Sequence, residues 1–496
     1  MSDPASFRPE ARNPRGFQDR RARDLGAERV VLEKVARVYE SYGFEPFDSP
    51  AFEYADALGK FLPDADRPNE GVFALQDDDE QWMALRYDLT APLARFAAEN
   101  WETLPKPFRR YAYGPVWRNE KPGPGRYREF VQCDADTVGS DRPEADAEII
   151  AMAVEGLAAA GLPRGAYVLK INSRKLLDGL LAEAGVTDGP RKLVSLRAVD
   201  KLDRLGWEGV KDLLGPGRLD ESGAFTKGAA LDPAAIEAIG EFLDISTKQG
   251  GVLKALARLK LGAAGEEGLR ELECIEDALE GLGLKDDQAR FDPSVVRGLE
   301  YYTGAVFEAE LLLETTDEKG QPVRFGSVGG GGRYDDLVAR FTGQRVPATG
   351  FSFGVSRLAA ALRAAGHPAA AGARGPVVVI AFDQARMADY FALARELRAA
   401  GVAAEVYLGS SGMKAQMKYA DRRLAPAAVI LGEDEIAQGV VTIKDLDLGR
   451  ALAAGMQDNA AWRAERPGQV TVARGELVAT VLKIMEADAA PLGARP

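Results

Sequence analysis

The sequence is poor in the residues that build redox and metal centres. Its 496 residues include only two cysteines, Cys133 and Cys274, and one histidine, His367. Two cysteines cannot form a disulfide framework, and no pairs of cysteine or histidine occur at the spacings of a zinc site. His367 lies in a stretch of Ala, Gly and Pro that is typical of a linker. Ser-His and Cys-His catalysis is therefore excluded unless His367 is the catalytic histidine. We therefore expect no zinc and no protein-bound metal.

Long apolar runs are also missing. The first 19 residues carry Arg, Pro and Asp without an apolar segment, and nowhere do about 18 apolar residues follow one another. This pattern predicts neither export nor membrane insertion, and we expect a cytoplasmic protein. A chain of 496 residues is too long for one hydrophobic core and should hold two or three domains.

The chain has an excess of acidic residues but one local basic segment. Its net charge of −13 argues against a protein that coats nucleic acid indiscriminately. Residues 106–128 nevertheless carry seven basic residues and a single acid, Glu120. The seven are Lys106, Arg109, Arg110, Arg118, Lys121, Arg126 and Arg128. Either a solvated face or a local surface for a polyanion fits this segment.

The first elements of the chain suit a dimer. Apolar residues at helical spacing predict an amphipathic helix over residues 28–42, and Gly43 is a natural stop. The strand expected at 43–47 contains Pro46, and Pro50 follows it. Proline is confined to edge positions of a sheet, which puts this strand at an edge or at a partner interface.

Two further segments place polar residues on strands. Residues 82–90 read as a strand with Asp88 and Thr90 at its end, where a helix cap and a functional site are both possible. Residues 108–139 predict a long antiparallel hairpin. Period-two alternation on its second strand places five side chains on one face: Arg128, Phe130, Gln132, Asp134 and Asp136. Such a face is either solvated or needs a polar ligand.

The second half of the chain has three polar or glycine-rich stretches. Residues 295–304 hold an Arg, an acid and two Tyr between glycines, which suits an exposed turn or a substrate pocket. The glycine run at 326–335 lets the backbone approach a ligand closely but matches neither a Walker loop nor a Rossmann fingerprint. After a strand at 349–354, Arg357 lies in the first turn of a helix. A cation there opposes the helix dipole and suits either a bound polyanion or simple exposure.

Two regions differ in character from the rest. Residues 181–290 alternate short helical runs with Gly and Pro and predict a mostly helical insertion. The sequence of this insertion does not indicate its function. After the linker at 367–375, residues 376–432 show a βαβαβ pattern with parallel pairing. The second helix of that pattern carries Lys414, Lys418, Arg422 and Arg423. These residues form either a solvated face or a contact for RNA backbone.

Four motifs together resemble those of histidyl-tRNA synthetases, a class II family. They are residues 87–90, 117–120 with 125–132, 297–304, and 331–335. The resemblance runs from residues 13–16 to 443–446 and implies an α+β fold. Its catalytic domain would be an antiparallel sheet flanked by helices, built from residues 1–180 and 291–366. An insertion at 181–290, a linker at 367–375 and an α/β anticodon-binding domain at 376–496 would complete a homodimeric subunit.

The resemblance also implies the reaction and the site. The chain would attach L-histidine to tRNA(His) through histidyl-adenylate, with Mg²⁺ accompanying ATP and no protein nucleophile. ATP would be bound by Arg118 at the α-phosphate, Glu120 at the adenine amino group, Phe130 by stacking and Arg357 at the γ-phosphate. Histidine would be bound by Asp88, Thr90 and Gln132 at its amino end, and by Asp136, Tyr302 and Tyr301 at the imidazole. Arg297 would face Arg118 across the α-phosphate and, with it, be catalytic.

The motifs depart from the common bacterial form in three places. Asp136 stands where many bacterial members have Glu, and residues 87–90 replace Pro-Glu-Gly-Thr, which is similar to the eukaryote-like branch. The hairpin loop at 121–125 lacks the Arg and Gln of the common form. In the family this loop meets the tRNA acceptor end, a role that falls here to Lys121, Gly123 and Arg126. We expect a changed dependence on the extra 5′ guanosine of tRNA(His).

A non-catalytic alternative uses the same fold. The regulatory subunit of ATP phosphoribosyltransferase is a histidine-sensing paralogue of these synthetases. Such paralogues typically lack the anticodon-binding domain and alter the segment that corresponds to residues 297–302. Both features are intact in this sequence, which favours the enzyme.

Overall fold

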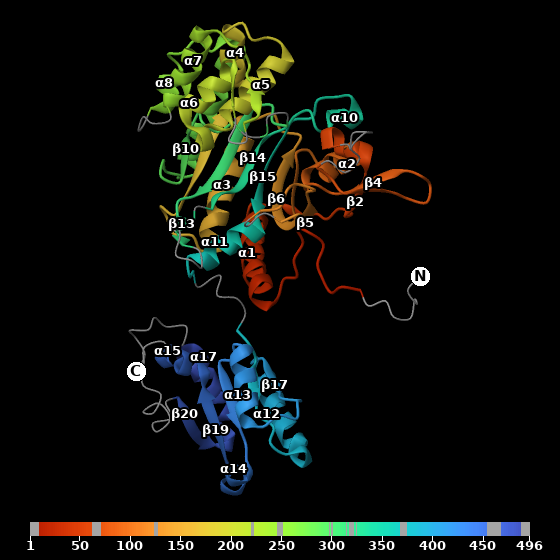
Figure 1. Cartoon of the computed structure of the whole chain (residues 1–496), viewed down its shortest axis with the longest axis vertical. Coiled ribbons are helices and arrows are strands. Elements are labelled where there is room, and N and C mark those ends of the chain that lie inside the picture. Colours follow the sequence, from red (N-terminus) through yellow and green to blue (C-terminus); the bar gives the residue numbers. More distant parts are fainter. Residues whose placement is uncertain are drawn as a thin grey trace. The chain divides into compact units, whose positions relative to one another are not determined.

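The computed structural model describes most of the chain and divides it into two compact units (Figure 1). The units are Met1–Gly372 and Ala373–Pro496. The described residues are 9–61, 71–123, 127–219, 223–245, 251–296, 298, 301–313, 315–316, 322–323, 325–367, 374–453 and 468–487. In these ranges no helix has the length and apolar character needed to cross a membrane.

An eight-stranded sheet forms the centre of the first unit, in the order β1-β5-β6-β15-β14-β11-β7-β10. Its strands are β1 (Glu45–Pro46), β5 (Phe108–Trp117), β6 (Glu129–Val138), β7 (Tyr167–Ser173), β10 (Ala289–Phe291), β11 (Ala305–Leu311), β14 (Gly326–Arg333) and β15 (Ala348–Gly354). The six inner strands are antiparallel. Only the edge strands β1 and β10 pair in parallel. This arrangement confirms the predicted antiparallel sheet, with β1 at an edge.

Three helices cover one face of this sheet (Figure 1). They are α1 (Ala22–Ser41), α3 (Pro143–Ala160) and α11 (Val355–Ala364). Their apolar stripes pack with Cys133 and Ala135 of β6 in one continuous core. Because successive strand residues point to opposite faces, the polar residues of β6 point away from this helical layer. The helix expected at 28–42 in fact begins at Ala22.

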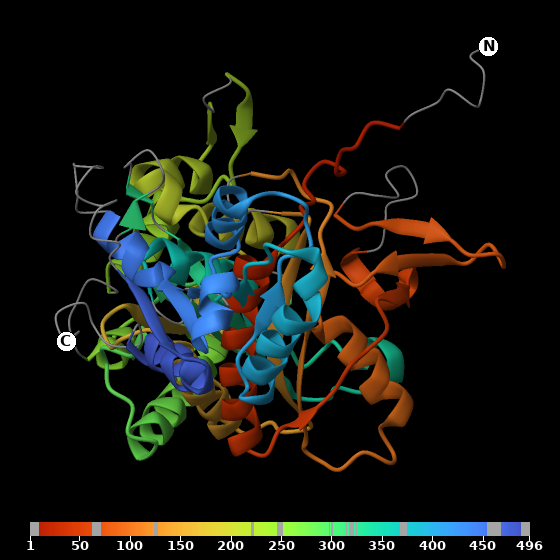
Figure 2. The same ribbon diagram turned by 90° about the horizontal axis from the view of Figure 1, so that it is seen from below.

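A smaller sheet and a helix extend the other side of the first unit. The three-stranded sheet has the order β2-β4-β3, formed by β2 (Phe52–Tyr54), β3 (Ala74–Gln76) and β4 (Trp82–Leu85). It is followed by α2 (Thr90–Asn100), with the 3-10 helix η2 (Ala55–Phe61) beside it. Figure 2 shows this sheet, in orange, projecting from the rest of the unit. Phe52, Tyr54 and Leu75 are exposed on it.

The insertion is mostly helical, as predicted. The helix α4 (Arg174–Glu183) leads into the predicted range 181–290. Within that range the helices are α5 (Gly189–Val199), α6 (Leu202–Leu214), α7 (Pro233–Asp244), α8 (Val252–Leu256) and α9 (Gly262–Gly281). A hairpin of β8 (Gly217–Leu219) and β9 (Phe225–Lys227) interrupts them. The short elements β12 (Thr315–Thr316), β13 (Pro322–Val323) and α10 (Ala339–Thr342) complete the unit. The buried side chains of the insertion are continuous with the main core.

The second unit is a five-stranded sheet with helices. The strand order is β17-β16-β18-β19-β20, formed by β16 (Val377–Val379), β17 (Ala404–Val406), β18 (Ala427–Ile430), β19 (Val440–Asp445) and β20 (Gln469–Ala473). The helices are α12 (Met387–Ala399), α13 (Met413–Arg422), α14 (Glu433–Gln438), α15 (Leu446–Ala453) and α17 (Leu477–Ala487), with the 3-10 turns η5 (Gln384–Arg386) and η6 (Arg474–Glu476). The parallel pairing of β16 with β17 and β18 confirms the predicted βαβαβ pattern. The antiparallel strands β19 and β20 extend it.

Candidate active site

The face of the main sheet opposite α1 and α3 carries a row of polar residues on β6. Asp136 lies opposite Arg110 of β5 and Gly350 of β15. Two residues earlier, Asp134 lies opposite Ala112 and Ser352. Gln132, two residues before that, is also buried. The polar face expected from period-two alternation is therefore a buried one, and the solvated alternative for residues 132–136 is wrong.

Arg110 and Asp136 form a fully buried ion pair on this face. Arg110 Nη2 lies 2.7 Å from Asp136 Oδ2, and both side chains are inaccessible to solvent. The Tyr334 hydroxyl donates a hydrogen bond to Asp136 Oδ1, and Arg110 Nη2 also donates to the Leu89 carbonyl at 2.9 Å. Burial raises the pKa of Asp136, and the Arg110 charge opposes that rise. Sequence reasoning missed Arg110 and Tyr334, because the cross-strand register that places Arg110 opposite Asp136 is seen only in the folded hairpin.

Glycines on the neighbouring strands make room for these side chains. A Cβ atom at Gly350 would overlap Asp136 Oδ1 and would lie 2.6 Å from Asp136 Cγ and 2.9 Å from the Ala135 carbonyl oxygen. A Cβ atom at Gly332 would lie 2.8 Å from Tyr302 Cδ1. Gly350 of β15 therefore accommodates Asp136, and Gly332 of the glycine run accommodates Tyr302.

Gly350→Ala is expected to destabilise the first unit because the new methyl group displaces Asp136. Overpacking of this kind costs about 1–3 kcal/mol of unfolding free energy. Gly330→Ala is the matched control, since a Cβ atom there would meet only the Phe307 carbonyl oxygen at 3.5 Å. Calorimetric unfolding of the two variants provides the measurement. Equal midpoints for Gly350→Ala and Gly330→Ala would contradict the crowding at Asp136.

The end of β4 and the start of α2 meet the same face. Asp88 Oδ1 accepts hydrogen bonds from the backbone N–H groups of Thr90 and Ala91, at 3.1 and 2.8 Å, so Asp88 caps α2. Burial, followed by the negative charge of Asp88, raises the pKa of Tyr301 well above its ordinary value, while a hydrogen bond with Thr90 lowers it. Asp88, Thr90 and Tyr301 are therefore brought together.

The tyrosine pair closes one side of this group. The ring centroids of Tyr301 and Tyr302 are 5.3 Å apart in an edge-on arrangement, and those of Tyr301 and Tyr334 are 5.7 Å apart. Because Tyr334 donates to Asp136, the aromatic cluster is continuous with the Arg110–Asp136 pair. Contacts or strand register thus connect five of the six predicted histidine-binding residues on this face: Asp88, Thr90, Gln132, Asp136 and Tyr301. The sixth, Tyr302, contacts Tyr301.

A second cluster lies at the loop end of the β5–β6 hairpin. The Arg118 guanidinium carbon lies 4.3 Å from the Tyr87 ring centroid and 5.1 Å from that of Phe130, and Arg118 Nε lies 3.3 Å from the Tyr87 carbonyl oxygen that accepts its hydrogen bond. The Tyr87 hydroxyl donates to Glu120 Oε1 at 3.0 Å. Burial is the main cause that raises the pKa of Tyr87 to about 12, and Arg118 opposes it. Arg118 therefore contacts both Tyr87 and Phe130, and Tyr87 connects Arg118 to Glu120.

Arg357 belongs to a helix that packs beside this cluster. The backbone N–H of Val131 donates to Ser356 Oγ at 3.1 Å, which ties the first turn of α11 to β6. Arg357 is the next residue of that turn and is partly buried. The structure thus places the helix start that carries Arg357 next to the strand that carries Phe130.

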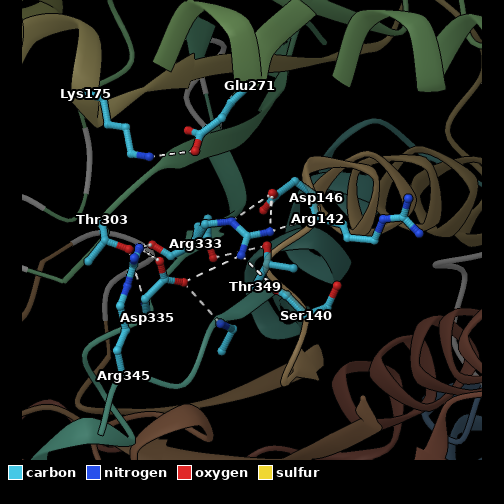
Figure 3. Close-up of polar contacts among 12 residues, drawn as sticks. Ser140, Arg142, Asp146, Lys175, Glu271, Thr303, Arg333, Asp335, Arg345 and Thr349 are labelled. Carbon is cyan, nitrogen blue, oxygen red and sulfur yellow. Dashed lines mark hydrogen bonds and ion pairs between the residues drawn. The ribbon is translucent and has the colours of Figure 1, made fainter. Parts of the chain in front are cut away.

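Arg333 and Asp335 of the fourth motif have a structural role (Figure 3). Arg333 donates to Asp146 Oδ2 from Nε and Nη2, at 3.0 and 2.6 Å, and to the carbonyl oxygens of Ser140 and Arg142 at the start of α3. Asp335 accepts from the Ala348 N–H at 3.2 Å and from Arg345. These bonds join the end of β14 to α3 and β15, behind the polar face.

Four of the predicted residues, Arg297, Arg126, Lys121 and Gly123, are not placed with the others. Arg297 and Arg126 lie outside the described residues, and Glu300 of the same motif does too. Lys121 and Gly123 are exposed in the hairpin loop. Arg128 supports the base of this loop, because its Nε donates to the Glu120 carbonyl at 3.0 Å and its N–H to the Gly16 carbonyl at 2.8 Å.

Family comparisons match the two units separately. A family model described as histidyl-tRNA synthetase matches residues 16–358, and one described as anticodon binding domain matches residues 376–484. A histidine–tRNA ligase of Caulobacter vibrioides is 72% identical over 97% of this chain and 97% of its own length. One from Brucella ovis is 54% identical over 99% of this chain and 98% of its own length.

Solved structures agree with the sequence comparisons. The chain is similar to a histidyl-tRNA synthetase from Nostoc sp. PCC 7120, with a TM-score of 0.71 and 28% identity over 96% of this chain and 100% of that one. A structure from Bacillus halodurans, described as an ATP phosphoribosyltransferase regulatory subunit/histidyl-tRNA synthetase, has a TM-score of 0.64. Its 22% identity, over 83% of this chain and 97% of that one, shows a shared fold alone.

Proposed function

This chain belongs to the histidyl-tRNA synthetase family, and from that membership we propose that it attaches L-histidine to tRNA(His) in an ATP-dependent reaction through histidyl-adenylate. It is a class II aminoacyl-tRNA synthetase, as its relatives are. The observation that carries the proposal is the match over both units together with the joint placement of two polar clusters along β6. One cluster suits a nucleotide and the other suits an amino acid.

The nucleotide would lie at the Arg118 cluster. Arg118 would bind the α-phosphate, Phe130 would stack on adenine, Glu120 would accept from the adenine amino group and Arg357 would meet the γ-phosphate. Planar guanidinium groups suit this task because their fixed donors bind phosphate oxygens in pairs and spread the negative charge. Mg²⁺ would enter with ATP and neutralise part of the triphosphate charge. Arg297 would approach the α-phosphate from the side opposite Arg118.

Histidine would lie on the Asp136 side of the same strand. Asp88, Thr90 and Gln132 would hold its amino end, while Asp136 and Tyr302 would meet the imidazole and Tyr301 would line the pocket. Each carboxylate oxygen has more than one lone pair, so Asp136 can accept an imidazole N–H in addition to its contacts with Arg110 and Tyr334. That acceptor position stays unpaired when an apolar analogue binds, which discriminates more strongly than pocket shape. This polar recognition is the physical reason to expect high selectivity for histidine.

The chemistry needs no protein nucleophile. A carboxylate oxygen of histidine would attack the α-phosphorus in line with the leaving pyrophosphate, and Arg118 and Arg297 would stabilise the added negative charge. The 3′-terminal ribose hydroxyl of the tRNA would then attack the histidyl carbonyl carbon and release AMP. The protein supplies position and charge in both steps.

A cytoplasmic homodimer is the expected assembly. The edge strand β1 and the exposed apolar face of the β2-β4-β3 sheet support this proposal. Phe52, Tyr54 and Leu75 are 42%, 57% and 43% exposed on that sheet. Contiguous apolar residues of this size usually mark a contact with another chain.

The second unit would bind the anticodon arm. Lys414, Lys418 and Arg422 are exposed along α13, where their charges suit RNA backbone. Arg423 is engaged with Glu405, with Nε–Oε1 and Nη2–Oε2 distances of 3.1 Å. The first three residues are therefore the better candidates for tRNA contact.

The acceptor end of the tRNA would meet the hairpin loop. Lys121, Gly123 and Arg126 offer a sparse set of contacts compared with the Arg and Gln of the common bacterial loop. We expect tRNA(His) transcripts with and without the extra 5′ guanosine to differ less in charging efficiency than with a common bacterial enzyme, or to differ in the opposite sense. Single-turnover charging of the two transcripts measures this difference. A strict requirement for the guanosine would contradict the expectation.

The regulatory-subunit alternative is less favoured. The anticodon-binding match at residues 376–484 and the 72% identity to a histidine–tRNA ligase both favour the enzyme. Charging of a tRNA(His) transcript with labelled histidine tests the whole reaction. Acid-precipitable histidine that depends on ATP and on the transcript supports the proposal, and histidine binding without charging would support the alternative.

A further inference from the structure

Asp134 is the buried acid that the roles above leave unused. It lies on β6 between Gln132 and Asp136, on the same face, and is 1% exposed. Its neighbours across the ladder are Ala112 and Ser352. Both of these side chains are small, and neither is charged.

The carboxylate of Asp134 lacks the partners that Asp136 has. Both oxygens of Asp136 are engaged, by Arg110 and by Tyr334. Among the described residues neither oxygen of Asp134 accepts a hydrogen bond of ordinary geometry. The Ser352 hydroxyl is near enough to lower the pKa of the carboxyl, although it falls short of that geometry. A buried acceptor without a partner costs free energy unless a ligand supplies the donor.

Gln132 adds a third acceptor of the same kind. Its amide nitrogen donates to Ser352 Oγ at 2.8 Å, and its Oε1 atom is buried without a partner among the described residues. Three unpartnered acceptor atoms therefore lie on adjacent positions of one strand face. An ammonium group supplies three N–H donors and a positive charge, which fits this set better than a neutral ring does.

The charge balance of the face points the same way. The groups that act electrostatically on Asp134 are two acids, Asp136 and Asp88, and one cation, Arg110. Arg110 forms its ion pair with Asp136 and, within the described part of the chain, none with Asp134. Ionised Asp134 thus leaves this face with an excess of negative charge that a bound cation would offset.

We propose that Asp134 binds the α-ammonium group of substrate histidine together with Gln132, as an additional specificity residue. This inference rests on the proposed function and names a residue of its amino-acid subsite. The two acids of β6 then have different roles. Asp136, which contacts Arg110 and Tyr334, would meet the imidazole, and Asp134 would bind the ammonium group.

Binding should then be linked to a proton. Burial, and next the charge of Asp136, raise the pKa of Asp134 to about 8, while Arg110 and the Ser352 hydroxyl oppose the rise and Asp88 adds to it. Cys133 and Tyr39 also sense the charge of Asp134, and burial keeps both neutral by raising their own pKa values. The carboxyl is therefore mostly protonated at pH 7 without substrate and must ionise to bind the ammonium group. Histidine affinity should rise with pH from 6 to 8.

Asp134→Asn tests the proposal by removing the charge while keeping the shape. We expect the histidine Kd to rise roughly ten- to hundredfold at pH 8, the loss typical of one hydrogen bond to a charged group. The variant should also lose the wild-type pH dependence between 6 and 8. ATP affinity should be unchanged, and the unfolding midpoint at pH 8 should be no lower than that of the wild type. If Asp134 had only a structural role, Asp134→Asn would leave the histidine Kd unchanged and lower the unfolding midpoint.

Two comparisons make the result specific. Asp178→Asn removes a partly buried carboxylate on α4 that pairs with Arg174 and Lys192, and it should leave the histidine Kd unchanged. The competitor 3-(imidazol-4-yl)propionic acid lacks the ammonium group, so wild type and Asp134→Asn should bind it equally. A histidine Kd within twofold of wild type, or an equal penalty for the competitor, would overturn the proposal. If the wild type itself does not activate histidine, the proposed function fails instead.

Discussion

Arg118→Ala is expected to lower kcat/KM for histidine-dependent ATP–pyrophosphate exchange by about 100- to 1000-fold, the range typical of removing a group that stabilises transition-state charge. The guanidinium is held between the rings of Tyr87 and Phe130 and by the Tyr87 carbonyl. This support fixes its orientation before ATP arrives. The loss should appear mainly in kcat, because the negative charge that Arg118 would meet grows in the transition state.

Two further variants separate charge from geometry at this position. Arg118→Lys keeps the charge but loses the planar fork, so its activity should lie between that of wild type and Arg118→Ala. Arg164→Ala removes an exposed arginine that pairs with Asp287 and should keep wild-type activity. The assignment of Arg118 to the α-phosphate would be wrong if Arg118→Ala retained more than a third of the wild-type kcat/KM.

Arg110→Met is expected to lower the unfolding free energy of the first unit by about 3–5 kcal/mol, because it leaves the Asp136 carboxylate buried without its cation. The double variant Arg110→Met/Asp136→Asn should recover most of this loss. Arg109→Met is a matched control from the adjacent position of β5, since Arg109 pairs with Glu148 at a partly exposed site. That pair should contribute about 1 kcal/mol or less.

The pH dependence of Arg110→Met has a defined sign. Burial raises the pKa of Asp136 and Arg110 opposes the rise, so removing Arg110 should raise the pKa further. The native variant then binds a proton that the unfolded chain does not bind at neutral pH, and its stability increases as the pH falls. Unfolding at pH 5.5 and pH 8 should show a smaller deficit at pH 5.5. A deficit equal to that of Arg109→Met at both pH values would contradict the buried pair.

The polar face of β6 could be predicted from the sequence, but the ion-pair partner of Asp136 could not. Alternation along β6 depends only on local strand geometry, so the positions of Gln132, Asp134 and Asp136 could be predicted from the pattern. The partner of Asp136 depends on the cross-strand register of a ten-residue hairpin strand, β5. Arg110 consequently read as one member of a basic segment, when it is the buried cation of the site.

The role of Gly350 also depends on long-range strand pairing. The glycine run at 326–335 predicted close backbone approach. Gly350 lies outside that run, and its reason becomes clear only when β15 lies against β6 and brings it opposite Asp136. The antiparallel strands β19 and β20 likewise depend on long-range pairing. The roles of Arg297 and of the loop residue Arg126 stay predictions from the motifs.

Residues on the polar face of β6 are expected to support the activation of histidine with ATP. Histidine-dependent ATP–pyrophosphate exchange on the purified full chain, in the presence of Mg²⁺, tests it most directly. We expect exchange with L-histidine and only background exchange with the other amino acids. An absence of exchange with histidine, from protein that is folded and binds ATP, would contradict this expectation.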